Sequence, residues 1–343
     1  MRALVIGHSG CIALADVPEP DRDGECRIRV RMAGICGTDL QLLEGYAGFR
    51  GIPGHEFVGV VESGPPGDAS WIGKRVVGEI NIGCGRCRWC AAGVKEHCGD
   101  RSVVGIRHRD GAFAELLSLP AGNLHEIPGS MDDETAVFVE PAAAACRVLQ
   151  QIAIDDRTRV AVLGDGRMGL LVAQVIRTAT PHVIVLGRHE HKLAVARALG
   201  LSTLSTGQSD SPVAAAGRFD VVVDVTGRPG GLTRALELVR PRGTVVMKST
   251  FHGEAALAPW PIVVDEITLI GSRCGPFRPA IELLASGAVQ VKPLISRVAS
   301  LPEHESAFAD ARRALKILLS PYEDRRNGSR AASVSSGSSS GRK

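Results

Sequence analysis

Residues 160–175 read VAVLGDGRMGLLVAQV, and this stretch decides the fold of the second half of the chain. An apolar run leads into three glycines, and a helical apolar pattern follows them. Gly164 allows a tight turn, Gly166 lets the backbone approach a pyrophosphate, and Gly169 permits close packing of a helix on a sheet. Because a helix N-terminus favours an anion, the stretch predicts a dinucleotide-binding turn rather than a merely glycine-rich one.

The sequence around this stretch alternates between buried strands and helices. Continuous apolar runs of this kind are typical of parallel strands that are buried on both faces. Alternating βα units in turn predict an open, doubly wound sheet, so the fold class is α/β. The expected strands lie at 160–163, 183–186, 221–225, 244–247 and 268–271, and the expected helices at 168–177, 190–199 and 232–239, the last stopped by Pro241 and Gly243.

The rest of the chain has a different texture. Short apolar runs before residue 145 are separated by glycine and proline, which predicts a β-rich domain with strands at 28–30, 57–61 and 75–77. Residues 276–319 hold two helical patterns and one short extended segment, too little for a separate core, so we expect them to pack back on another domain. The predicted division is 1–145 (β-rich), 146–275 (dinucleotide-binding), 276–320 (returning segment) and 321–343 (disordered tail).

The 343-residue chain has a formal net charge of +3, and the distribution of that charge matters. From Tyr322 to Lys343 there are five basic and two acidic residues, so the serine-rich tail carries the excess and the body is neutral. A neutral body gives no electrostatic footprint for nucleic acid. No apolar run approaches the roughly 20 residues that span a bilayer, and the start MRALVIGHSG indicates a first strand rather than a signal peptide. We therefore expect a cytoplasmic protein that binds neither nucleic acid nor membrane.

Four of the nine cysteines cluster in a single short stretch with the spacing C-x2-C-x2-C-x7-C. Such clustering in a cytoplasmic chain indicates a metal site rather than disulfides, and it disfavours the alternative of four free surface thiols. Four thiolates close a tetrahedral shell around Zn²⁺ and leave no position for a substrate, so the predicted zinc is structural. Its ligands are Cys84, Cys87, Cys90 and Cys98.

A second set of metal-binding side chains is dispersed. Cys36 lies in GICGTDLQ, His55 and Glu56 in GIPGHEFVG, and Glu140 in FVEPAAAA. Each residue alone has an ordinary interpretation, such as a buried thiol or a glutamate that stabilises a helix start. Together they supply one thiolate, one imidazole and a carboxylate, which is the chemistry of a catalytic zinc with an open position.

With these motifs in hand, the chain resembles the zinc-containing medium-chain dehydrogenase/reductase family, the relatives of alcohol and sorbitol dehydrogenases. The resemblance covers residues 1 to about 320. It implies a GroES-like β-rich catalytic domain, an inserted Rossmann domain and a C-terminal return to the catalytic domain. It also implies an oxidoreductase that transfers a hydride between an alcohol or polyol, or its carbonyl form, and a nicotinamide cofactor.

The resemblance assigns roles to individual residues. Cys36 and His55 match zinc ligands, and Glu140 matches the position where family members place a cysteine or an acidic residue. The carboxylate version is similar to the polyol and sugar dehydrogenase branch. Glu56 matches a glutamate beside the zinc that coordinates when substrate is absent. The sequence thus implies two zinc ions per chain, one catalytic and one structural.

Three further positions carry over from the family. Asp39 matches a carboxylate that orients the ligand histidine, and Thr38 matches the hydroxyl that passes on the substrate proton. Lys316 falls where the family has a basic residue near the cofactor phosphates. One position departs from the pattern, because Gln41 replaces a histidine that often ends the proton relay.

The turn after the second Rossmann strand concerns cofactor choice. It reads VIVLGRHEHK, with Gly187, Arg188 and His189 where a carboxylate for the ribose 2′-hydroxyl is expected. Without that carboxylate the repulsion of a 2′-phosphate is lost, and Arg188 offers two donors at once. The sequence therefore predicts NADP(H) over NAD(H), against the alternative that Arg188 is solvated and either cofactor serves.

Two other functions remain open. A zinc-free quinone or enone reductase of the same superfold would need none of Cys36, His55 and Glu140, and a non-catalytic nucleotide-binding protein would be expected to lose them. Zinc counting separates these alternatives, with two ions per chain for the dehydrogenase and at most one for a relative without the catalytic site. The edge strand 268–271 predicts a homodimer or homotetramer, and the small-molecule substrate stays unidentified.

Overall fold

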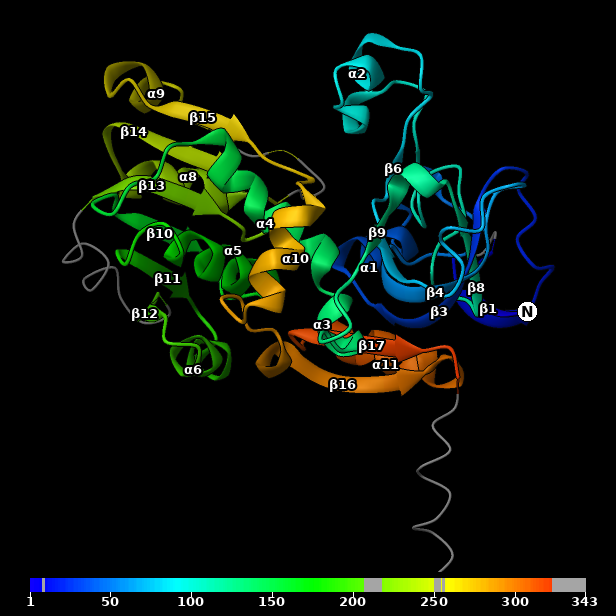
Figure 1. The fold of residues 1–343 in the computed structure, drawn as a ribbon. Coiled ribbons are helices and arrows are strands. Elements are labelled where there is room, and N and C mark those ends of the chain that lie inside the picture. Colours follow the sequence, from blue (N-terminus) through cyan, green and yellow to red (C-terminus); the bar gives the residue numbers. More distant parts are fainter. Residues whose placement is uncertain (8–9, 207–217, 250–253, 255–256, 323–343) are drawn as a thin grey trace, which may run out of the picture.

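The computed structural model describes residues 1–7, 10–206, 218–249, 254 and 257–322. Two large sheets lie side by side, and helices α4 and α10 lie between them (Figure 1). One sheet has six strands and the other seven. The predicted disordered tail lies, from residue 323 on, outside the described residues.

The six-stranded sheet is parallel throughout, as the apolar runs predicted. The strand order reverses between β10 and β13, and ligands of doubly wound sheets bind at such a point. The sequence pattern missed β12 because its residues STLS are polar and half exposed. In spatial order the strands are β12 (Ser202–Ser205), β11 (Val183–Gly187), β10 (Val160–Leu163), β13 (Phe219–Asp224), β14 (Val239–Met247) and β15 (Thr268–Gly271).

The three predicted helices of this half are present within two residues of their predicted ends, and the short α9 was not predicted. The last helix was expected to run through Val239, but it ends at Leu238 and β14 begins at once. The pairing of β13 with β14 shifts register between Phe219 and Val221, and Pro241 follows on the β14 side. Proline has no N–H to donate to a strand ladder, so it is tolerated where the ladder is interrupted, as it is here. The helices are α5 (Arg167–Arg177), α6 (Glu190–Ala198), α8 (Gly230–Leu238) and the short α9 (Trp260–Val264).

The seven-stranded sheet contains the three strands predicted in the first part of the chain. The stretch after residue 276 returns to it, because β17 pairs antiparallel with β3. That stretch supplies two strands where the sequence pattern indicated one extended segment. The strands are β16 (Ile295–Ser300), β17 (Lys316–Ser320), β3 (Cys26–Gly34), β4 (Glu56–Ser63), β5 (Arg75–Gly78) and β9 (Leu124–Glu126), with β8 (Leu116–Leu119) also on β3, while β1 (Arg2–Ile6) and β2 (Ile12–Asp16) form a hairpin.

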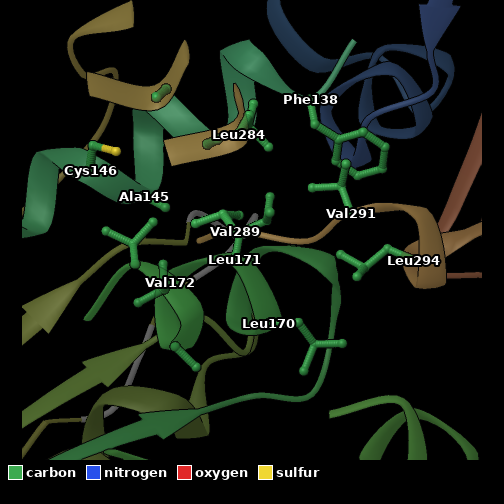
Figure 2. Close-up of a cluster of buried hydrophobic side chains, with 14 of the residues drawn as sticks. Phe138, Ala145, Cys146, Leu170, Leu171, Val172, Leu284, Val289, Val291 and Leu294 are labelled. Atoms are coloured by element: carbon green, nitrogen blue, oxygen red, sulfur yellow. The ribbon is translucent and has the colours of Figure 1, made fainter. Parts of the chain in front are cut away.

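A continuous apolar core joins the two halves. It forms where α4 (Val139–Gln151) packs on α5 and on α10 (Phe277–Ala285). Figure 2 shows Phe138, Leu171 and Val291 converging there, and the same cluster includes Val58 of β4. Burial of one such side chain contributes about 1.5–3 kcal/mol, so this core fixes how the halves sit relative to each other.

The remaining elements are short. The lobe that carries α2 (Arg88–Ala91) projects from the seven-stranded half (Figure 1), and β6 (Asn81–Ile82) and β7 (Ser102–Val103) pair at its base. No helix in the described part of the chain is long and apolar enough to cross a membrane. The other helices are α1 (Gly37–Leu43), α3 (Asp133–Ala136) and α11 (His304–Ala311).

Candidate functional site

Strand pairing brings the first three predicted ligands together. β3 ends at Gly34, which pairs with Glu56 at the start of β4, so Cys36 and His55 meet just beyond the two strand ends. One ligand atom from each of Cys36, His55 and Glu56 lies within 4.8 Å of the others. Thiolate, imidazole and carboxylate are the donors that zinc takes, so the side chains present fit this metal.

Asp39 organises this corner. As the third residue of α1 it accepts a hydrogen bond from the backbone N–H of Cys36 at 2.7 Å, which closes a capping box at the helix start. Its other oxygen lies 3.4 Å from Nδ1 of His55. The same first turn places Oγ1 of Thr38 3.9 Å from Sγ of Cys36. The helix start therefore holds Cys36, the carboxylate partner of His55 and the predicted relay hydroxyl in one place.

Cys36 and Asp39 stabilise the charged form of His55, and His55 stabilises that of Cys36. Burial alone would raise the pKa of Cys36, but the neighbouring His55 lowers it to about 5. Burial opposes a charge on His55, yet Asp39 and Cys36 raise its pKa well above the usual value. Cys36 is thus held as a thiolate, the form that binds metal.

Lys316 has a buried carboxylate partner that the sequence did not predict. It is fully buried at the start of β17, and its ammonium group pairs with Glu56 and donates to the carbonyl of Ile35. Burial lowers its pKa to about 8. A lysine buried this deeply requires a carboxylate partner, and β17 lies against that of Glu56. The place near the cofactor phosphates that the resemblance implies stays a prediction. Gly34 leaves the room, since a Cβ there would lie 2.8 Å from both side chains.

Glu140 stands apart from the other three candidate ligands. It lies in the first turn of α4 and is not one of the three residues whose ligand atoms cluster. Burial raises its pKa to about 7, and the charges of His55 and Cys36 act on it. The structure therefore gathers Glu56 with Cys36 and His55, while Glu140 faces the same charges from the neighbouring helix.

A cavity of about 300 Å³ borders Glu140. Asn81 lines it with a buried Oδ1 that has no hydrogen-bond partner among the described residues, while its Nδ2 donates to Sγ of Cys274 at 3.3 Å. Nearby, Lys248 donates to the carbonyl of Arg273 at 2.6 Å, and burial lowers its pKa to about 8. Sequence reasoning found none of these residues, because each is an isolated polar residue in an ordinary context.

The four clustered cysteines converge at the lobe of α2. Their sulfur atoms all lie within 4.8 Å of one another, and those of Cys87 and Cys90 are 3.6 Å apart. A tetrahedron with Zn–S bonds of about 2.3 Å has S···S edges of about 3.8 Å, so the cluster fits a zinc ion. Gly83 is required here, since a Cβ would lie 2.5 Å from Sγ of Cys90.

The glycine turn borders a crevice of about 520 Å³ at the carboxyl ends of β10, β11 and β13. Gly164 has φ +130°, and a Cβ on Gly169 would lie 2.0 Å from the carbonyl oxygen of Gly164. Arg167 begins α5 and donates to the carbonyl of Leu315 at 3.2 Å. Its guanidinium also lies 3.3 Å from the Cβ position of Gly37, so it connects the glycine turn with the helix of Thr38.

The expected lack of a carboxylate at the end of β11 is wrong. Asp165, from the glycine turn itself, accepts hydrogen bonds at 2.7 Å from the backbone N–H groups of Arg188 and His189. A Cβ on Gly187 would lie 2.6 Å from Oδ2 of Asp165. Gly187 therefore makes room for a carboxylate that reaches the same place from another segment. The acidic residue is visible in the sequence as the aspartate of GDGRMG, but it stands in the glycine turn rather than after β11.

Comparison with known proteins shows which family this architecture belongs to. The family described as the alcohol dehydrogenase GroES-like domain matches residues 22–129, and the zinc-binding dehydrogenase family matches residues 168–286. The fold and these two matches define a dehydrogenase of the alcohol or polyol type. The chain belongs to the zinc-dependent medium-chain dehydrogenase/reductase family.

Individual relatives cover nearly the whole chain. A sorbitol dehydrogenase of Halalkalibacterium halodurans is 29% identical over 94% of this chain and 100% of its own length. The solved structure of an alcohol dehydrogenase, RspB of Escherichia coli, complexed with NADH has a TM-score of 0.87 at 26% identity and covers 93% of this chain and 99% of that one. A protein of Sinorhizobium meliloti described as a zinc-binding dehydrogenase, bound to NADP, has a TM-score of 0.86 at 31% identity with the same coverage. The chain is accordingly an oxidoreductase of the alcohol or polyol dehydrogenase type.

Proposed function

We propose that the protein is a dehydrogenase with two zinc ions per chain that transfers a hydride between an alcohol or polyol and a nicotinamide cofactor. The observation that carries the proposal is the meeting of Cys36, His55 and Thr38 at one corner. Arg167 links that corner to the glycine turn of the dinucleotide crevice. A zinc-free reductase would need no such cluster.

The side chains divide the work. A zinc ion held there supplies a Lewis acid that polarises the substrate oxygen, and the cofactor supplies the hydride chemistry. Cys36 and His55 hold the ion, and Asp39 keeps the imidazole oriented. Thr38 takes the hydroxyl proton of the substrate and passes it toward solvent or the cofactor ribose, since Gln41 does not titrate.

Glu140 completes the ligand set in this proposal. Glu56 is closer to Cys36 and His55, but its charge is already paired with Lys316. No ion pair of Glu140 is found in the described part of the chain, so its carboxylate is free to neutralise the metal. One thiolate and one carboxylate cancel the +2 charge of zinc, and a neutral centre still polarises an oxygen.

The substrate belongs to the polyhydroxy class in this proposal. Polar side chains form part of the lining of the cavity beside Glu140, and the unpartnered Oδ1 of Asn81 suits a hydroxyl donor. The relative that acts on sorbitol supports the same class. A screen of simple alcohols against polyols, with both cofactors and in both directions, tests it. Turnover of monohydric alcohols alone would contradict the polyol assignment.

For the cofactor, we propose NADP(H) over NAD(H). Support comes from the cationic side chains that line the dinucleotide crevice, and from the relative bound to NADP. Asp165 acts against this preference through its negative charge. Measurement of kcat/KM with each cofactor decides the matter, and a wild type that prefers NAD(H) would overturn the proposal. The cations are Arg188, Lys192, Arg228 and Arg234.

Self-association is part of the same proposal. β15 is an edge strand of the parallel sheet, and Trp260 and Val263 just before it are 64% and 75% exposed. Pairing of two such edges about a twofold axis would cover both the strand and these side chains. We expect a dimer or a dimer of dimers by light scattering at micromolar concentration, and Val263→Glu should weaken it. A strictly monomeric mass would contradict this assignment. The cytoplasmic location stays a prediction.

A further inference from the structure

Asp165 is a buried acidic residue to which no role was assigned from the sequence. It stands between Gly164 and Gly166 in the glycine turn and is 7% exposed. Its Oδ2 accepts hydrogen bonds from two successive backbone N–H groups, those of Arg188 and His189, each at 2.7 Å. Its Oδ1 lies 3.0 Å from Nδ1 of His189. Burial would raise its pKa, but the hydrogen bonds from His189 and Arg188 lower it, which keeps the carboxylate ionised.

The position of this charge is defined by Gly187. A Cβ built on Gly187 would lie 2.5 Å from Cβ and 2.6 Å from Oδ2 of Asp165. The Asp165 carboxylate therefore fills the space in which a side chain at the end of β11 would begin. In dinucleotide-binding sheets this strand end faces the ribose of the adenosine moiety. Asp165 lines the crevice there together with Arg188 and His189.

Asp165 also occupies two hydrogen-bond donors that would otherwise face the crevice. Successive backbone N–H groups of a turn form a concavity that favours an anion. Here the N–H groups of Arg188 and His189 already point at a carboxylate from the same chain. A phosphate on the ribose 2′-oxygen would meet a negative charge and would find these two donors occupied. A free 2′-hydroxyl carries no charge and suffers no such repulsion.

We propose that Asp165 determines cofactor specificity by weakening the binding of the 2′-phosphorylated dinucleotide relative to the form with a free 2′-hydroxyl. This inference rests on the proposed function only in that the crevice holds a nicotinamide dinucleotide. It makes the choice between NADP(H) and NAD(H) a balance of two opposing charges, Arg188 attracting the 2′-phosphate and Asp165 repelling it. Removal of the Asp165 charge should raise the affinity for NADP(H) relative to NAD(H), and removal of the Arg188 charge should lower it.

The test measures binding without turnover, on the full chain as purified with its metal. Isothermal titration calorimetry with adenosine 2′,5′-bisphosphate and with 5′-AMP gives the ratio of their dissociation constants, and NADP⁺ and NAD⁺ give it for the intact cofactors. Asp165→Asn keeps the shape and an acceptor for the two N–H groups but removes the charge. We expect the ratio to shift at least about tenfold toward the 2′-phosphorylated ligand, because the variant removes the repulsion between two negative charges.

A matched control removes a nearby negative charge that lies outside the crevice. Glu190→Gln at the start of α6 neutralises an exposed carboxylate paired with Arg197, and the ratio should stay within about twofold. Asp165→Ser provides a second uncharged variant with a short acceptor, and it should shift the ratio in the same direction. Thermal melts check that both variants are folded.

The outcomes are distinct. An unchanged ratio in both folded Asp165 variants, or a parallel loss of affinity for both ligands, would overturn the inference and leave Asp165 as an organiser of the turn. A wild type that binds neither dinucleotide would overturn the proposed function and this inference with it. Binding of both dinucleotides with an unmoved ratio contradicts only the role of Asp165.

Discussion

The two candidate metal centres form in opposite ways. The four cysteines of the α2 lobe lie within one short stretch, and local turns at glycines bring their sulfur atoms together. The other centre draws Cys36 from beyond the end of β3 and His55 and Glu56 from the start of β4, and in our proposal Glu140 from α4. The four sulfur atoms of the first gather around one point, whereas the second has Glu140 at a cavity and Arg167 between α1 and the glycine turn. A site within one short stretch is suited to stabilising a lobe. A site built from several elements forms only when those elements are correctly packed.

This contrast predicts that damage to the dispersed centre removes activity and that damage to the local centre removes stability. The largest effect on turnover should follow from His55→Ala. Loss of the metal's polarising effect costs several kcal/mol, so turnover should fall at least about 10³-fold. Steady-state kinetics measure the fall, and circular dichroism should show an unchanged fold. Near-normal activity in this variant would remove His55 from the catalytic site.

Thr38 is the next position. Proton transfer by a positioned side chain is worth about 10²–10⁴-fold, so Thr38→Val should reduce turnover within that range. Thr38→Ser keeps the hydroxyl and should retain most of the activity. The pair of variants separates chemistry from packing beside Cys36. Equal losses in both would point to packing and contradict a proton relay.

The two carboxylates of the dispersed centre give a sharper comparison. If Glu140 is the third ligand, Glu140→Gln should lower zinc affinity and turnover by about 100-fold or more, since even partners outside the ligand shell contribute 10–100-fold. Glu56→Gln should keep the catalytic zinc, although it leaves Lys316 buried without its ion pair and should lower the melting temperature. Competition with a zinc chelator measures both affinities. Loss of zinc in Glu56→Gln but not in Glu140→Gln would contradict this assignment and make Glu56 the third ligand.

The smallest effect on turnover should come from the local centre. Cys87→Ser opens the four-sulfur shell, and a structural zinc contributes folding free energy. The melting temperature or soluble yield should drop, while kcat per folded molecule changes little. Differential scanning fluorimetry and active-site titration measure the two quantities. A large fall in kcat with unchanged stability would contradict a structural role.

The same contrast explains what the sequence could and could not predict. β10, β11 and β13 were predicted because they are apolar runs buried in a parallel sheet, and the four-cysteine site because its ligands are neighbours in sequence. β12 was missed because an edge strand needs no apolar run. The pairing of Lys316 with Glu56 joins residues 260 positions apart, and no local pattern records it. Asp165 was missed because it reaches the end of β11 from a different segment.

Zinc counting in three matched proteins tests the separation of the two centres most directly. Inductively coupled plasma mass spectrometry on folded, dialysed protein should give two zinc ions per chain for the wild type and one for each of His55→Ala and Cys87→Ser. Activity should be lost in the first variant and kept per folded molecule in the second. One zinc ion or none in the active wild type, or two in His55→Ala, would contradict the account.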